Sequence, residues 1–81
     1  MTEDQVFDKV REVLVEHLDL EESHITPESS LRDDLGASSL ELAELVLEFE
    51  KQTNTVIELE DLADVNTVVD VVGLIMSKLD G

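Results

Sequence analysis

The sequence predicts an all-α fold, a small four-helix bundle of three main helices and one short helix with a long loop between helices one and two. Apolar residues recur at helical spacing in three segments, and two of these segments begin with a capping-box pattern. The length of 81 residues, 42% of them hydrophobic, is enough for one core and no more. We therefore expect a single domain spanning residues 1–81.

The first helix is predicted over about residues 3–18. Thr2 is followed three residues later by Gln5, which is a capping-box pattern, and acidic Glu3 and Asp4 suit the positive end of the helix dipole. The apolar side chains that recur at helical spacing are Val6, Val10, Val13, Leu14 and Leu18.

A long connection follows, from residue 19 to residue 37, in which this periodicity fades. Pro27, Gly36 and several serines interrupt it. Because a loop of this length needs contacts with the core to be ordered, we expect its apolar side chains to hold it there; these are Ile25, Leu31 and Leu35.

The second helix is predicted to begin at Ser38 or Ser39. Ser38 and Glu41 satisfy the S-x-x-E pattern, and apolar residues then recur as far as Phe49. Residues 53–55, Thr-Asn-Thr, are expected to end the helix.

The rest of the chain predicts one short and one long helix. Residues 59–64 can form one or two turns. Asn66 or Thr67 is expected to cap the last helix, whose apolar stripe contains Val68, Val72, Ile75 and Leu79. The valine-rich opening at 68–72 is also compatible with a strand, although length and caps favour a helix.

The second helix has two apolar faces. Leu42, Leu45, Val46 and Phe49 fall on one side, as a core stripe should, and Leu40, Ala43 and Leu47 fall nearly opposite, flanked by Glu41, Glu44 and Glu48. Folding needs only one of these faces. The second is either a set of scattered surface residues or a docking strip with an acidic rim for a partner that has a basic surface.

Composition excludes several classes of function. Five Lys and Arg against 21 Asp and Glu give a formal charge of −16, and the chain has no Trp or Tyr, which argues against nucleic-acid binding. Without cysteine there is no disulfide, thiolate metal site or cysteine nucleophile. No apolar run reaches membrane-spanning length, so we expect a soluble, cytoplasmic protein. We also expect a monomer.

Catalytic patterns are equally scarce. His17 and His24 fit no metal-ligand spacing, and there is no calcium-binding loop or G-x-S-x-G nucleophile motif. We expect neither an enzyme nor a metal site.

A serine motif is the exception. In residues 33–40 a hydroxyl follows Gly36 at the start of a helix, where serine ordinarily acts as an N-cap. The same position favours an anion such as a phosphate ester. Since the sequence places no base close to this serine, another enzyme would have to modify it.

Residues 34–40 read Asp-Leu-Gly-Ala-Ser-Ser-Leu and resemble the Asp-Leu-Gly-x-Asp-Ser-Leu signature of the acyl carrier proteins. The acidic helix that follows, Leu18-Asp19-Leu20 and Ile25-Thr26 upstream, and Ile57 and residues 65–68 downstream are also similar to this family. The resemblance covers nearly the whole chain.

The resemblance implies that Ser39 carries 4′-phosphopantetheine, transferred from coenzyme A by a phosphopantetheinyl transferase. The thiol of this arm would hold acyl groups as thioesters for acyltransferases, ketosynthases and other acyl-processing enzymes of fatty-acid, polyketide or specialised lipid pathways. Acyl chains would enter the aliphatic interior. By position, the residues implied to contact these partners are Leu40, Glu41, Ala43, Glu44, Leu47 and Glu48.

Three departures from the family pattern matter. Ser38 replaces the usual Asp, which leaves two candidate serines, of which the distance from Gly36 favours Ser39. Thr53 and Glu58 replace a common Phe and a common Pro, which hints at a specialised carrier. The alternatives are a peptidyl or aminoacyl carrier, an acidic adaptor or nucleic-acid mimic without a prosthetic group, and a regulatory domain that binds divalent cations loosely.

Overall fold

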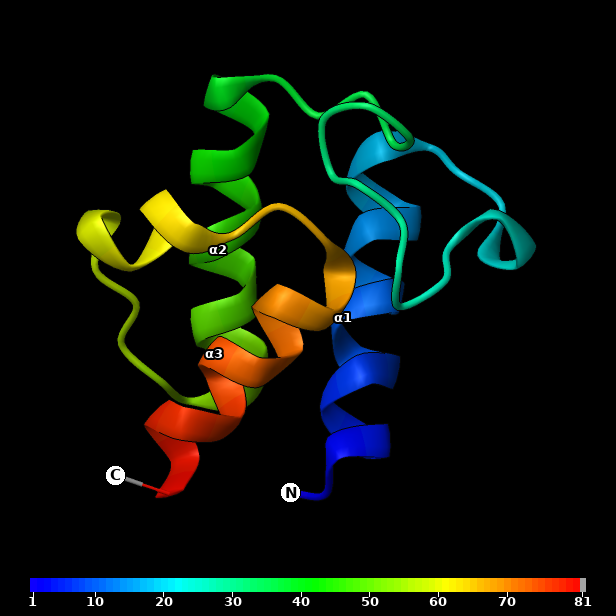
Figure 1. The fold of residues 1–81 in the computed structure, drawn as a ribbon. Helices are drawn as coiled ribbons and strands as arrows, with labels where there is room; N and C mark the ends of the chain where they lie inside the picture. The colour runs from blue at the N-terminus through cyan, green and yellow to red at the C-terminus, as the bar shows by residue number, and fades with distance from the viewer. Residues whose placement is uncertain (81) are drawn as a thin grey trace.

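The computed structural model describes residues 1–80 and contains three α-helices and two short 3₁₀ helices (Figure 1). The all-α prediction is confirmed, and the two predicted capping boxes lie at the starts of α1 and α2. In chain order the elements are α1 (Glu3–Leu18), η1 (Glu22–His24), α2 (Ser39–Thr53), η2 (Leu59–Asp64) and α3 (Val68–Asp80). The sequence did not predict η1.

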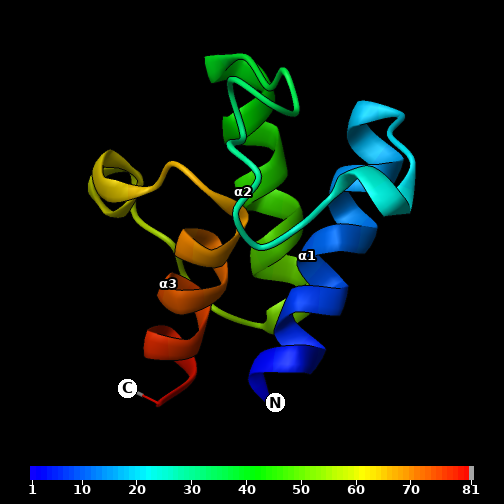
Figure 2. The same ribbon diagram turned by 45° about the vertical axis from the view of Figure 1, so that its right-hand side comes forward.

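Helix α1 is the centre of the packing. It lies against both α2 and α3 in the two views (Figures 1 and 2). The core between the helices is made of aliphatic side chains and Phe49, and its fully buried members include Val6, Val10, Leu14, Leu45, Val68 and Ile75. The predicted stripe of α3 is confirmed, with Leu79 only half-buried and Val71 buried in addition.

The connection between α1 and α2 is held to this core as predicted. Ile25, Leu31 and Leu35 are all buried. Ser29, also buried, accepts a hydrogen bond at its Oγ from the backbone N–H of Thr26 at 3.0 Å, so its hydroxyl is satisfied inside the loop. The long loop is therefore an ordered part of the fold.

The strand alternative for residues 68–72 is wrong, because these residues form the first turns of α3. Thr67 Oγ1 accepts the N–H of Asp70 at 3.3 Å. Asp70 Oδ2 in turn accepts the N–H groups of Thr67 and Asn66, each at 3.0 Å. This reciprocal cap selects the helix over the β-propensity of the valines.

A backbone pairing joins the long loop to the start of α3. An isolated antiparallel β-bridge links Ser30 to Thr67. The N–H of Val68 donates to the carbonyl of Ser29 at 3.0 Å, and the next N–H donates to the carbonyl of Pro27 at 2.9 Å. The first N–H groups of a helix have no partner inside it, so here the loop supplies part of the N-terminal cap of α3.

Helix α2 ends within the predicted segment. Asn54 adopts the left-handed conformation, with φ 54°, and its N–H bonds to the carbonyl of Glu50. Thr53 is buried, and its Oγ1 donates to the carbonyl of Phe49 at 2.7 Å. The helix therefore continues for one turn beyond the apolar pattern that predicted it.

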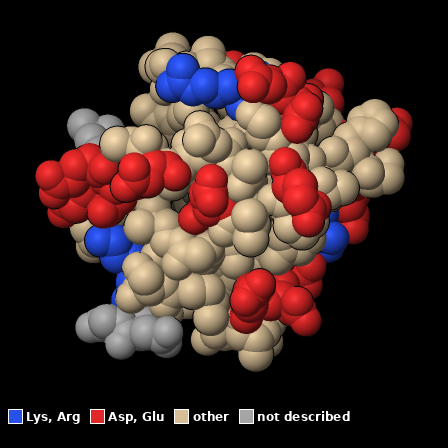
Figure 3. Space-filling view, viewed as in Figure 1, with Lys and Arg blue, Asp and Glu red and all other residues tan. Residues whose placement is uncertain are grey.

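On the face of the molecule in Figure 3, Asp and Glu cover more of the surface than Lys and Arg do, and other residues cover most of it. The acidic side chains form several separate groups there, whereas Lys and Arg occupy small areas. None of the helices within residues 1–80 is long and apolar enough to cross a membrane.

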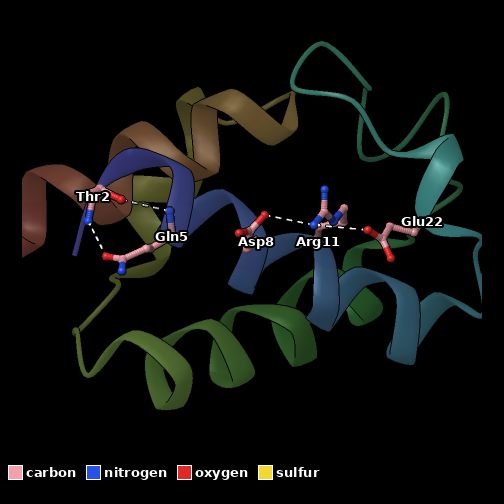
Figure 4. A network of polar contacts seen from close by, with 5 residues as sticks. All are labelled: Thr2, Gln5, Asp8, Arg11 and Glu22. Atoms are coloured by element: carbon pink, nitrogen blue, oxygen red, sulfur yellow. Dashed lines mark hydrogen bonds and ion pairs between the residues drawn. The ribbon is translucent and has the colours of Figure 1, made fainter.

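One basic residue ties α1 to η1 (Figure 4). Nη2 of Arg11 lies 2.9 Å from Oδ1 of Asp8 and 3.3 Å from Oε1 of Glu22. The guanidinium also lies over the ring of Phe7, with Cζ 5.3 Å from its centroid. These contacts fix the beginning of the long loop against α1.

Candidate functional site at the start of α2

Two neighbouring serines lie at the start of α2, and their hydroxyls have different partners. Ser38 is the N-cap: its Oγ accepts the N–H of Glu41 at 3.2 Å, and Oε1 of Glu41 accepts the N–H of Ser38 at 3.0 Å. Ser39 is the first residue of the helix, and its exposed hydroxyl accepts a hydrogen bond from Nη2 of Arg32 at 3.2 Å. The structure thus distinguishes a hydroxyl used by the helix from one directed to the surface.

The turn before these serines is rigidly placed. Gly36 has φ 72°, a left-handed conformation that disfavours other residues. Ala37 is buried, and its N–H donates to the carbonyl of Leu31 at 2.8 Å. The chain therefore enters α2 from a fixed direction, with Ser39 at the surface.

The start of α2 has mixed electrostatics. The N–H groups of the first turn and the helix dipole favour an anion there. Arg32 adds a positive charge next to Ser39, whereas Glu41 in the first turn adds a negative one that is already bonded to Ser38. Arg32 was not among the site residues predicted from the sequence. Its available signal was a basic residue immediately before the acidic stretch that begins at Asp33.

The second apolar face of α2 is exposed. Leu40 is 71% and Leu47 is 59% exposed, whereas Leu45 on the opposite face is completely buried. Ala43 and Glu44 are also exposed. The core therefore uses one side of α2 only, and the other side carries apolar residues that packing does not explain.

Two of the glutamates assigned to this face have structural contacts as well. Glu41 belongs to the capping box. Glu48 pairs with Lys51, with Oε1 and Nζ 3.5 Å apart, and its side chain is only 29% exposed. Glu44 is exposed, whereas Glu41 and Glu48 are half-buried.

A small apolar cavity of about 30 Å³ lies between α2, η2 and α3. This is about the space of one water molecule, too little for an acyl chain without movement of its walls. The lining is aliphatic apart from one aromatic ring, and its residues are Leu31, Leu42, Val46, Phe49, Ile57, Leu62, Val65, Val71 and Leu74.

The two histidines are both exposed, His17 in the last turn of α1 and His24 in η1. Among the residues that the structure describes, no three His, Asp or Glu side chains are grouped so that they could hold a metal ion.

Comparison with known proteins identifies the family. The phosphopantetheine attachment site family matches residues 8–75. An acyl carrier protein of Petrotoga mobilis is 41% identical over 99% of this chain and 94% of that protein. An acyl carrier protein of Thermotoga maritima is also 41% identical, over 94% of this chain and 94% of that protein. The chain belongs to the acyl carrier protein family. A solved structure of an acyl carrier protein from Enterococcus faecalis superposes with a TM-score of 0.79 at 36% identity, over 96% of this chain and 99% of that one.

The start of α2 is suited to the prosthetic group that this family implies. A phosphodiester on the hydroxyl of Ser39 would point to the surface, beside the guanidinium of Arg32 and the first N–H groups of the helix. In this chain an exposed hydroxyl and a positive charge therefore lie side by side at the start of α2. When bound, the group supplies the thiol that this cysteine-free chain lacks.

Proposed function

We propose that the chain carries acyl groups as thioesters on a 4′-phosphopantetheine arm attached covalently to Ser39. The observation that carries this proposal is the difference between the two serines. Ser38 uses its hydroxyl to cap α2, whereas Ser39 exposes its hydroxyl beside Arg32 in a chain of the acyl carrier protein family. Among the described residues, the one side-chain hydrogen bond of Ser39 comes from Arg32, a cation that cannot act as its base, so a phosphopantetheinyl transferase would provide the chemistry.

The exposed face of α2 is the proposed contact surface for that transferase and for acyl-processing enzymes. Exposed Leu40 and Leu47 would supply apolar contact area, and the glutamates around them would attract basic surfaces. The proposed contact residues are Leu40, Glu41, Ala43, Glu44, Leu47 and Glu48. The protein would act in the cytoplasm, within a fatty-acid, polyketide or specialised lipid pathway.

Intact-mass spectrometry tests the attachment site. The wild type, Ser39→Ala and Ser38→Ala are incubated with coenzyme A, magnesium and a broad-specificity phosphopantetheinyl transferase. We expect one phosphopantetheine-sized gain in the wild type and in Ser38→Ala, and none in Ser39→Ala. Loss of the Ser38 cap should cost about 1 kcal/mol of stability, which leaves the protein folded.

The same experiment separates the alternatives. No mass gain in the wild type would reject the carrier and favour an acidic adaptor that binds partners without a prosthetic group. A gain that is lost in Ser38→Ala and kept in Ser39→Ala would move the site by one residue. Loading the modified protein with acyl, aminoacyl and peptidyl groups would then distinguish an acyl carrier from a peptidyl carrier.

A further inference from the structure

Arg32 differs from the basic residues that form ion pairs in this chain. Arg11, Lys51 and Lys78 each lie within 4.0 Å of a carboxylate oxygen. Among the side chains that the structure describes, no such ion pair involves Arg32, although the chain has 21 acidic residues. Its Nη2 donates instead to the hydroxyl of Ser39.

Ser30 fixes the turn that follows Arg32 and engages the carboxylate of one of the two acids next to it. Oδ2 of Asp34 accepts the backbone N–H of Ser30 at 2.7 Å. The backbone N–H of Asp33 donates to Oγ of Ser30 at 3.1 Å. These bonds shape the turn so that the exposed guanidinium extends toward Ser39 while the carboxylate of Asp34 is engaged with Ser30.

We propose that Arg32 binds the phosphodiester of the arm and thereby positions it against the start of α2. This inference rests on the proposed attachment at Ser39. Esterification leaves Ser39 Oγ a weaker acceptor and adds charged phosphoryl oxygens within reach of the same donor. A planar guanidinium can bind two such oxygens at once, which an ammonium cannot do with fixed geometry.

The negative charge of the chain makes a cation at this position favourable for a phosphodiester. The phosphodiester adds a negative charge to a chain of formal charge −16, close to Glu41. Without a local cation, this repulsion would weaken the attraction between the phosphate and the start of the helix. Arg32 offsets this repulsion and restricts the directions in which the arm can leave the protein.

NMR of the phosphopantetheinylated protein tests the proposal. The chain has two arginines, so a spectrum of the Arg side-chain Nε–H groups has an internal control in Arg11, which is already paired with Asp8 and Glu22. We expect modification to shift the Arg32 signal and leave the Arg11 signal in place. The ³¹P resonance should change as NaCl is raised from about 0.01 M to about 1 M, over which the Debye length falls from ~30 Å to ~3 Å.

Variants make the test specific. Arg32→Gln should lose most of the salt-dependent ³¹P change, Arg32→Lys should restore part of it, and Lys51→Gln should behave as wild type. Lys51→Gln is the matched control because it removes one charge from a 73% exposed side chain in the last turn of α2. Because Arg32 is exposed, Arg32→Gln should stay folded, which circular dichroism checks.

The outcomes separate this proposal from the one it rests on. A modified protein in which the Arg32 signal does not move, or in which Arg32→Gln has the wild-type ³¹P response, overturns the role of Arg32 and leaves the carrier function intact. Absence of the phosphopantetheine mass in the wild type overturns both.

Discussion

Lys78 in the last turn of α3 forms an ion pair with Asp61 of η2, with Nζ and Oδ2 3.0 Å apart. The same oxygen accepts the backbone N–H of Glu58 at 2.9 Å. The segment that Asp61 holds contributes Leu62 to the wall of the apolar cavity. One carboxylate therefore shapes η2 and fastens it to α3.

Lys78→Gln should loosen η2 without unfolding the protein. We expect the backbone amides of η2 to exchange with solvent faster, by less than roughly fivefold, because a partly exposed ion pair contributes little. Amide hydrogen exchange followed by NMR measures this, with Lys51→Gln as a control of equal charge. Faster exchange throughout α1 and α2 would contradict a local role.

Asp70 should make stability depend on acid pH. The pKa of Asp70 lies below its ordinary value of 3.8, mainly because its carboxylate accepts the backbone N–H of Asn66 and, next in importance, that of Thr67. Desolvation of the carboxylate acts in the opposite direction. A lowered pKa means that the ionised carboxylate stabilises the fold fully above the ordinary value, and that this contribution is lost as the pH falls below it.

Asp70→Ala should therefore cost about 1 kcal/mol at pH 7, the usual worth of such a cap, and much less near pH 2. Urea denaturation of wild type and variant gives the loss of unfolding free energy at each pH. Comparing the two losses isolates the effect of Asp70, because the titration of the other acids is common to both proteins. An equal loss at both pH values would show that the charge of Asp70 is irrelevant.

Gly36→Ala should destabilise the protein by about 1–2 kcal/mol, since it places a Cβ on a left-handed residue. The cause is backbone strain alone, because an added Cβ at Gly36 meets no atom within 4 Å. Gly73→Ala is the matched control. Its added Cβ is equally free of contacts, but Gly73 lies inside α3, so alanine should stabilise by about 0.5–1 kcal/mol. Equal signs in chemical denaturation would refute this comparison.

Leu45 and Leu47 lie on opposite faces of α2, so substitutions at these two positions distinguish the roles of the two faces. Leu45→Ala removes a completely buried side chain and should cost about 2–5 kcal/mol, whereas Leu47→Ala removes one that is 59% exposed and should change stability little. If the exposed face binds partners, Leu47→Ala should instead slow phosphopantetheinyl transfer at low protein concentration. Thermal unfolding and transfer rates measure both effects. A normal transfer rate in Leu47→Ala would remove this residue from the contact surface.

Added cations should raise thermal stability. A formal charge of −16 on a small domain makes the folded state repel itself, and salt screens that repulsion. We expect the unfolding temperature to increase with NaCl, and to increase further with MgCl₂ at equal ionic strength. No change with either salt would show that self-repulsion does not limit stability.

Local signals predicted the helices well. The Thr2–Gln5 and Ser38–Glu41 boxes each involve residues three apart, and both helices begin where these pairs indicate. The two faces of α2 also followed from spacing alone, as the burial of Leu45 beside the exposure of Leu47 shows.

Contacts between distant residues were not predictable in this way. Nothing in the spacing indicates that Ser29 accepts the N–H of Val68, or that Arg32 reaches Ser39. The strand alternative for the valines at 68–72 was wrong because their β-propensity is outweighed by a helix cap. Asp70, in the first turn of the helix, accepts the backbone N–H of Thr67 and so favours the helix. The acyl group was not predictable either, and the small cavity does not set a length for it.

The bridge between Ser30 and Thr67 also has a consequence for the order of folding. All three helices have a cap made by near neighbours, but the first N–H groups of α3 also donate to carbonyls of the loop that precedes α2. Closing so long a stretch of chain is entropically slow. We therefore expect the docking of α3 to follow the ordering of that loop, so that mutations in the loop slow folding even where they lie far from the last helix in sequence.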